Sequence, residues 1–302
     1  MRSKYWIVIL PLLLVLVFCI VSLRQYVIAQ DAGQGLEISP PSQEVSVDPG
    51  KTVTISAKIR NPGNNTLPIK VSVEDFTAEG DEGATAIVAN SPYSITSWTK
   101  LSPSKFSLAP GDEQVVTATI TAPANAAGGH YGSFVFSVTS DTQQKNAAAV
   151  TQEVASLFLV RVNGPVNEKL TLTSMSAPAY SEFGPVPFTL DFSNEGNVHV
   201  KPFGLINVQD MFGNKVADIV VSGENVFPGA QRLITAQLDK KFLIGRYSAT
   251  ALMYYGAHNQ NLTAETSFVV FPTRVAIIIV VVLILLYLMR KRLKKATKAL
   301  FK

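Results

Sequence analysis

The feature that most constrains this chain is an alternation of apolar and polar residues that returns throughout 30–272. It is clearest at 52–59, 69–76, 113–120, 131–138, 187–193, 232–238 and 246–255. Such alternation buries one face of a β-strand and leaves the other in water. Turns rich in Pro, Gly and Asn separate these stretches, and no amphipathic helical pattern interrupts them. The pattern predicts an all-β fold of immunoglobulin-like β-sandwiches.

One set of landmarks occurs twice in the same order. LAPGDEQVVTATI (108–120) resembles VFPGAQRLITAQL (226–238), and each follows an Asn-containing turn, NPGNN or NEGN. Each also precedes a strand that opens with Gly and Tyr. Repetition at this spacing indicates an internal duplication. We therefore expect two tandem sandwiches, at 30–163 and 164–272.

The repeated landmarks have structural explanations. Pro-Gly supplies a preset φ followed by a residue that is free to take positive φ, as a tight turn requires. The glycine before each tyrosine would permit a sharp bend, and each tyrosine would bond through its hydroxyl to nearby backbone. The residues assigned these roles are Pro110, Gly111, Gly129, Tyr131, Pro228, Gly229, Gly245 and Tyr247.

Both ends of the chain carry long uncharged apolar runs. Residues 1–29 have two early basic residues, an apolar core and a small-residue pattern that ends at Ala29, typical of a signal peptide. Because the core is long and Arg24 follows it, an uncleaved signal-anchor is the alternative. Cys19 is the only cysteine, and the apolar run continues beyond it, so we expect neither lipidation nor disulfides.

The C-terminal run predicts a transmembrane helix at 273–290. Its uncharged part, 275–289, would span about 22 Å, and the flanking Arg274 and Arg290 can extend towards the lipid headgroups. Seven basic residues lie between Arg290 and Lys302. By the positive-inside rule, 291–302 is a cytoplasmic tail and the body is extracellular. The chain would be a cell-membrane protein that is single-pass, or two-pass if the signal is uncleaved.

Charge excludes one class of partner. All 22 acidic residues lie between 31 and 271, together with 15 basic ones, so the body has a net charge of about −7. The basic pI comes from the membrane flanks. A mildly acidic body without basic stripes is not expected to bind nucleic acid.

The sequence also offers no catalytic constellation. His130, His199 and His258 lack paired metal-ligand spacing, and no nucleophile motif accompanies them. Glu74 and Asp75 are adjacent on a strand and point to opposite faces. We therefore expect no enzyme activity, no metal and no cofactor.

Aromatic residues in the least regular stretch, 77–104, are the candidates for ligand binding. Tyr93 and Trp98 lie in SPYSITSWTK, and exposed aromatic rings on a loop can stack on sugars. The alternative is that Trp98, close to Leu101, covers the core.

The first repeat carries a longer series of motifs. It has SPPSQEVSVDPG, an Asn turn, a strand that ends in Asp75-Phe76, then Trp98, LAPG, PANA and GGHYG. This order resembles the peptidoglycan-binding-like first domain of WxL-interacting proteins of bacterial cell surfaces. The resemblance covers about 110 residues of the first repeat, and the second repeat shares only the generic landmarks.

The resemblance implies a membrane-anchored surface protein that binds cell-wall polysaccharide or another surface protein. The alternative function is an assembly factor, or a chaperone-like anchor for exported proteins, that acts by β-strand pairing along a sandwich edge.

Overall fold

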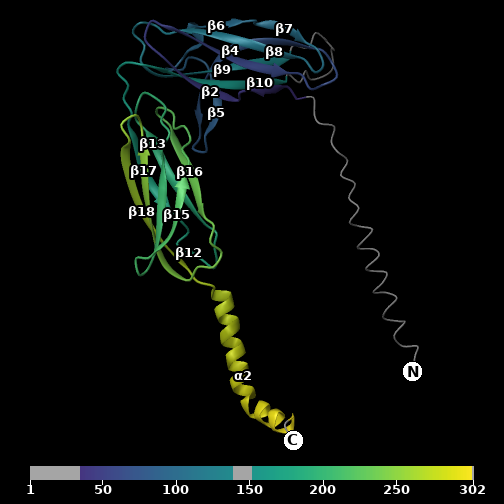
Figure 1. Cartoon of the computed structure of the whole chain (residues 1–302), viewed down its shortest axis with the longest axis vertical. Coiled ribbons are helices and arrows are strands. Elements are labelled where there is room, and N and C mark those ends of the chain that lie inside the picture. Colours follow the sequence, from purple (N-terminus) through teal and green to yellow (C-terminus); the bar gives the residue numbers. More distant parts are fainter. Residues whose placement is uncertain (1–34, 139–151, 301–302) are drawn as a thin grey trace, which may run out of the picture.

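The computed structural model describes residues 35–138 and 152–300, so the expectations for 1–29, including those for Cys19, lie outside the described residues. The described chain is mostly β, with four sheets followed by one α-helix. The sheets form two bodies, which we call the N-terminal sandwich (37–162) and the C-terminal sandwich (170–270). Figure 1 shows the N-terminal sandwich lying across one end of the C-terminal sandwich, while the helix leaves from the opposite end.

The N-terminal sandwich packs a four-stranded sheet, ordered β1-β3-β8-β6, against a sheet ordered β2-β10-β9-β4-β5, with β7 also on β4. In chain order its strands are β1 Glu37–Ser39, β2 Ser42–Val47, β3 Thr52–Arg60, β4 Leu67–Glu79, β5 Ala84–Val88, β6 Thr99–Ser102, β7 Lys105–Leu108, β8 Glu113–Thr121, β9 Gly128–Val138 and β10 Glu153–Val162. The alternating residues of β3 and β8, such as Ile59 and Ile120, meet Phe134, Phe136 and Phe158 in one buried core.

The C-terminal sandwich packs a three-stranded sheet, ordered β11-β13-β16, against a five-stranded sheet, ordered β12-β18-β17-β14-β15. Its strands are β11 Leu170–Ser176, β12 Tyr180–Ser181, β13 Val186–Asn194, β14 Phe203–Asp210, β15 Lys215–Val221, β16 Gln231–Leu238, β17 Gly245–Tyr255 and β18 Gln260–Val270. Phe188, Phe192 and Phe268 lie in a second, separate core.

The two Asn-containing turns explain why the Pro-Gly windows recur. Asn61, which is 1% exposed, donates through Nδ2 to the backbone oxygens of Asn65 (2.7 Å) and Leu108 (2.9 Å). Its Oδ1 accepts the Gly63 N–H at 3.0 Å, and its backbone oxygen accepts the Gly111 N–H at 2.7 Å. One buried amide therefore joins the end of β3 to the Pro-Gly turn before β8 and satisfies their buried backbone groups.

The C-terminal sandwich repeats every one of these bonds. Asn194 Nδ2 donates to the oxygens of Val198 (2.9 Å) and Val226 (2.7 Å). Its Oδ1 accepts the Gly196 N–H, and its backbone oxygen accepts the Gly229 N–H, both at 2.8 Å. The glycines of the two turns, Gly111 and Gly229, have φ of 79° and 73°, which side chains rarely tolerate.

The stretch 77–104, expected to be the least regular of the first repeat, is largely ordered. β4 continues to Glu79, turns and returns as β5, and a 3-10 turn at Thr96–Trp98 leads into β6. This hairpin projects beyond the N-terminal sandwich, so its tip does not contribute to the core of that sandwich and has low hydrophobicity. The low hydrophobicity led to the prediction of an irregular stretch.

The helix, α2 (Thr273–Leu300), begins three residues after β18. Its window Thr273–Arg290 has a mean hydropathy of 2.4 and none of it is buried in the protein, so it is long and apolar enough to cross a membrane. The helix continues past Arg290 through most of the basic tail. Lys and Arg are good helix formers, so the change from apolar to basic residues does not end it.

Candidate functional site

The β4–β5 hairpin reaches from the N-terminal to the C-terminal sandwich. Gly80 and Gly83, with φ of 65° and 83°, form its tip. The Leu233 N–H of β16 donates to the Asp81 oxygen of that tip at 2.7 Å. The hairpin is therefore a strut between the two sandwiches (Figure 1).

An aromatic cluster fills the joint behind the strut. Phe76, Tyr131 and Leu159 of the N-terminal sandwich bury Phe227 of the C-terminal sandwich. The Phe227 ring lies edge-on to both aromatic rings, with centroids 5.6 Å from Phe76 and 4.9 Å from Tyr131. Edge-to-face pairs at these distances are favourable, so the joint has a small core of its own.

A polar chain, buried at Tyr131 and His199 and exposed at Glu44, completes the joint. The Tyr131 hydroxyl accepts the His199 backbone N–H at 2.8 Å and lies 3.2 Å from His199 Nδ1, while His199 Nε2 lies 2.8 Å from Glu44 Oε1. Burial raises the pKa of the Tyr131 hydroxyl. The bond from His199 lowers the pKa of Glu44 and outweighs the opposing effect of burial. These contacts specify one arrangement of the two sandwiches.

A second tie joins the sandwiches on the other side. Glu168, in the connection between them, accepts from Arg161 Nη1 at 2.7 Å and from the Ala257 N–H at 2.8 Å. Burial raises the pKa of Glu168, but these two bonds and the Arg161 charge more than offset it and leave the pKa lowered. Together with the strut, this tie fixes the joint from both flanks.

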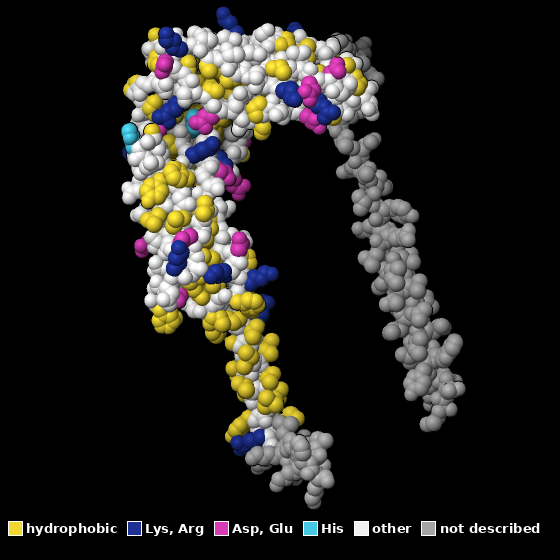
Figure 2. Space-filling model, viewed as in Figure 1, with side chains coloured by type: hydrophobic (Ala, Val, Ile, Leu, Met, Phe, Trp, Pro, Cys, Tyr) yellow, Lys and Arg dark blue, Asp and Glu magenta, His cyan; other side chains and the backbone are white. Residues whose placement is uncertain are grey.

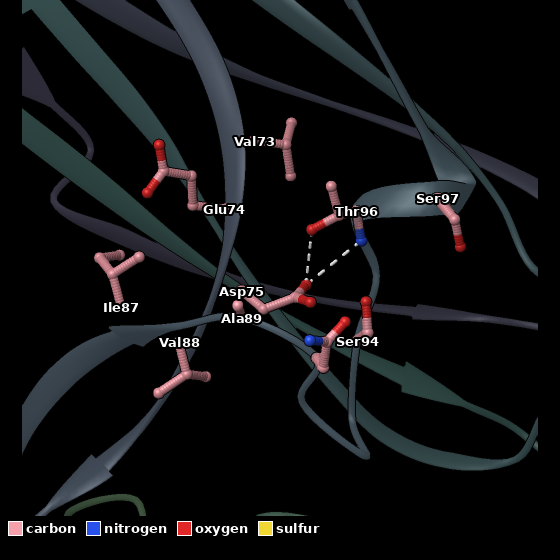
Figure 3. A pocket seen from close by; sticks show the side chains of 10 residues that line it. Val73, Glu74, Asp75, Ile87, Val88, Ala89, Ser94, Thr96 and Ser97 are labelled. Carbon is pink, nitrogen blue, oxygen red and sulfur yellow. Dashed lines mark hydrogen bonds between the residues drawn. The ribbon is translucent and has the colours of Figure 1, made fainter.

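Asp75 orders the segment that follows β5. Its Oδ1 accepts the Ile95 N–H at 3.0 Å and the Thr96 hydroxyl at 2.7 Å, whereas Glu74 points away from it (Figure 3). Burial raises the pKa of Asp75, but bonds from Ser94, Ile95 and Thr96 outweigh it and hold the pKa below its ordinary value. The carboxylate thus shapes the loop through its Oδ1.

A groove runs along the hairpin and across the joint. Its first part, a hollow of about 530 Å³ shown in Figure 3, lies between β4, β5 and 94–97. A second hollow shares Val88, Ala89 and Asn90 with the first, and a third shares Thr77, Pro228 and Gly229 with the second. The lining mixes apolar and hydroxyl side chains with the carboxylates of Glu74, Asp75 and Asp81.

β5 lines this groove with Ile87 and Val88, and no strand of the described residues pairs with its outer edge. Its five residues, ATAIV, include no charge and no proline, and Ile87 is 49% exposed. Longer edge strands such as β2, with Glu44, and β15, with Lys215 and Asp218, carry the charges that usually protect an edge, and the uncharged edge strand β12 is only two residues long. The edge of β11 is also uncharged, but unlike that of β5 it is covered, because β11 contacts β18 within the sandwich.

The aromatic residues proposed to bind sugars do not form an exposed platform. Tyr93 is half-buried with its ring 5.9 Å from that of Tyr131, and Trp98 packs on the N-terminal core with its ring 4.2 Å from His130. Only Tyr93 touches the groove, at the second hollow. Trp98 thus takes the alternative position, covering the core.

The repeated tyrosines and glycines also differ from expectation. Tyr247 bonds to the backbone of Ile244 nearby, at 3.1 Å to both N and O. The same expectation is wrong for Tyr131, whose hydroxyl binds His199 across the joint. Gly245 has φ of 123°, but in the first repeat the positive φ belongs to Gly128 rather than Gly129. A Cβ on Gly129 would instead overlap the Tyr131 hydroxyl.

The joint residues were missed by sequence reasoning. Glu44, Tyr131 and His199 are separated by 68 to 155 positions, and no spacing rule connects them. Tyr131 was predicted to stabilise a bend within the first repeat, but nothing in the neighbouring sequence marks it as a contact between the two sandwiches. Among the residues that the structure describes, no cluster of three or more metal-ligating side chains occurs.

Comparison with known proteins finds solved structures of low sequence identity. No family model matches the sequence, and no curated protein matches it. Similar solved structures include the class 5 fimbriae chaperone CfaA, with 12% identity over 78% of this chain and 99% of that chain, at a TM-score of 0.41. They also include the periplasmic chaperone SfaE (13% identity, 78% and 100% coverage, TM-score 0.35). A third is the chaperone–tip adhesin complex CsuC–CsuE of Acinetobacter baumannii (9%, 66% and 89%, TM-score 0.35). Likeness at this level does not assign a function to the chain.

Proposed function

We propose that the chain is a membrane-tethered holder of exported polypeptides, which accepts an extended segment as an added strand on the outer edge of β5. The observation that carries this is the unpaired, uncharged edge of β5 beside the groove. A bound strand would complete the backbone hydrogen bonds of that edge and place alternate side chains in the hollow beside Ile87 and Val88.

The length of the edge sets the strength of binding. Five residues extend about 17 Å, and each ladder hydrogen bond contributes about 0.5–1.5 kcal/mol net. Binding of this kind is weak, reversible and tolerant of side chains. These properties suit a holder that hands its client on, and they require no chemical step.

The tether and the joint give the edge its position. With α2 in the membrane and the basic tail inside, the body would lie outside the cell membrane, where exported chains emerge. The bond between Asp81 at the tip of the strut and Leu233, the aromatic cluster and the polar chain together hold β5 at a defined place between the two sandwiches. A surface protein is therefore the proposed partner, and cell-wall polysaccharide is the competing one, as the resemblance of the first repeat to WxL-interacting proteins suggests.

Binding of a model strand to the full chain in nanodiscs tests the proposal. The probe is a fluorescein-labelled nonapeptide of alternating valine and threonine, followed by fluorescence anisotropy. We expect saturable binding that Ile87→Lys weakens about tenfold or more, which corresponds to about 1.4 kcal/mol. Val220→Lys, a matched change at an exposed aliphatic residue on edge strand β15, should leave the affinity unchanged.

A second probe separates strand pairing from side-chain contacts. The same peptide, N-methylated at every second residue, keeps its side chains but loses the donors on one edge. Equal binding of the methylated peptide, no saturable binding at all, or equal effects of the two lysine variants would each overturn the proposal. Co-sedimentation with insoluble cell wall that survives Ile87→Lys would favour the polysaccharide alternative.

A further inference from the structure

The end of the C-terminal sandwich from which α2 leaves is formed by four segments. Strand pairing brings them together, because β12 pairs with the end of β18, β14 ends opposite the start of β17, and β13 begins opposite the end of β16. The segments are 180–185, 211–214, 239–244 and 271–273. We call their exposed surface the helix-side rim.

The rim is unusually apolar for loops in water. Phe242 is 88% exposed, Phe212 80%, Ile244 69% and Met211 66%. Phe183 and Phe271 add partly exposed rings. Figure 2 shows apolar side chains at this end of the sandwich, adjoining those of the helix. Exposed apolar groups that gather at one place mark an interaction surface.

The helix is held against this rim without a flexible linker. Only Phe271 and Pro272 separate β18 from α2. The Tyr180 hydroxyl lies 2.7 Å from the Phe271 oxygen and 2.9 Å from Thr273 Oγ1, and Thr273 Oγ1 donates to Glu182 at 2.6 Å. The start of the helix therefore stays level with the rim loops.

The length of the apolar window then places the rim relative to the membrane. The 18 residues from Thr273 to Arg290 span about 27 Å, slightly less than the hydrocarbon thickness of about 30 Å. If this window crosses the bilayer, none of it can be spared as a spacer, so Thr273 lies at the lipid boundary. The rim loops beside it must lie there too.

The charges around the rim agree with this position. Lys240 and Lys241 directly precede Phe242, and Arg274 is the second residue of the helix. The Lys240 ammonium donates to the Val216 oxygen at 2.7 Å. The acidic groups of the rim are already engaged: Glu182 with Arg274, Asp210 with its own turn, and Asp239 with Gln237. Basic groups that flank exposed aromatic residues suit a headgroup layer that contains anionic lipid.

We propose that Met211, Phe212, Phe242 and Ile244 insert into the interfacial layer of the same bilayer that α2 crosses. The occupant of this surface is lipid rather than a protein. Four anchors around the base of the helix would hold the C-terminal sandwich upright, with the N-terminal sandwich projecting sideways at the far end (Figure 1). This inference does not depend on strand binding at β5.

Lipid contact can be measured directly in the full chain. Cys19→Ser removes the only cysteine, and Phe212→Cys, Phe242→Cys or Val220→Cys then introduces a site for an NBD label. The protein is reconstituted in liposomes of phosphatidylcholine and phosphatidylglycerol, with or without doxyl groups near the headgroup end of the acyl chains. We expect strong quenching at 212 and 242, and little at 220, which is 77% exposed on β15.

A second variant set tests whether the anchors act together. With the label at Ile244→Cys, the pair Phe212→Ser and Phe242→Ser should reduce doxyl quenching severalfold, while Val220→Ser should not. Unchanged circular dichroism and unchanged peptide binding at β5 would show that the fold survives.

Quenching at 212 and 242 as low as at 220 would overturn the proposal. So would quenching at 244 that ignores the two serine substitutions while the fold is intact. Because no other protein is present in these liposomes, a surface that serves a protein partner instead would give the first of these results.

Discussion

Tyr131 and Tyr247 stand at matching places in the two repeats but bond to different parts of the molecule. The Tyr247 hydroxyl bonds to Ile244, three residues away, and stabilises the bend that starts β17. The Tyr131 hydroxyl accepts the His199 N–H of the other sandwich. One copy thus keeps a local role, and the other has become part of the joint.

The neighbouring glycines differ in the same way. Gly245 is needed for its backbone conformation, at φ of 123°. Gly129 is needed for space, because a Cβ there would overlap the Tyr131 hydroxyl and lie 3.2 Å from Val198 Cα in the other sandwich. Its N–H also donates to the Asn197 oxygen at 2.8 Å. A repeated motif therefore reports a shared fold, but the physical reason for a residue depends on what packs against it.

The largest effects should come where the two repeats agree. Asn61→Ala and Asn194→Ala each leave buried backbone groups of two turns without partners, and we expect each to lower the free energy of unfolding of its sandwich by about 3 kcal/mol. In a Trp6→Phe background, Trp98 fluorescence reports the N-terminal sandwich during urea unfolding of the full chain in micelles, and circular dichroism reports both. A loss below about 1 kcal/mol in either copy would show that the shared amide is not a shared stabiliser.

Substitution of the two tyrosines should distinguish the repeats, with smaller losses in the free energy of unfolding than the asparagine variants. Tyr131→Phe leaves the buried His199 N–H unpaired and should cost about 2 kcal/mol, whereas Tyr247→Phe, nearer to solvent, should cost about 1 kcal/mol. Only Tyr131→Phe should loosen the joint. Spin labels at Thr54→Cys and Ser267→Cys, in a Cys19→Ser background, give the distance distribution between the sandwiches. The distribution should broaden for Tyr131→Phe alone, and equal broadening in both variants would contradict the assigned difference.

Lowering the pH should produce the smallest change in stability, and it should act through Asp75 on the loop that follows β5. Asp75 has a folded-state pKa below its ordinary 3.8. Its stabilising contribution is complete above the unfolded pKa and is lost as the pH falls through the folded pKa. The urea midpoint of Trp98 fluorescence should therefore fall as the pH is lowered below about 4, and Asp75→Asn should flatten that dependence. An unchanged slope in the variant would show that Asp75 does not couple the loop to pH.

Much of each sandwich followed from local sequence. Alternation predicted strands at 52–59 and 113–120 that form as β3 and β8, since every second residue there must be buried. The 18-residue window of α2 was predicted from the apolar run 275–289 and the basic residues that follow it. In these segments the periodicity and composition of neighbouring residues decide which face is buried.

The strut was not predictable in this way. The hairpin tip is polar and rich in glycine, so it reads as a loop, and its order depends on β16, more than 140 residues later in the chain. The unpaired edge of β5 was not predictable for the same reason, because five uncharged residues carry no local signal of what lies beside them.

The sequence by itself determined that the chain builds paired β-sandwiches from a repeated plan and ends in a membrane-length helix. Periodicity, turn chemistry and hydropathy act between near neighbours, and these features depend on nothing else. Only the tertiary structure decided that Tyr131, His199 and Glu44 form the joint, that Trp98 covers the core, and that four loops gather beside α2. Each of these depends on the approach of segments far apart in the chain, and the energy of such contacts comes from the partner as much as from the residue itself.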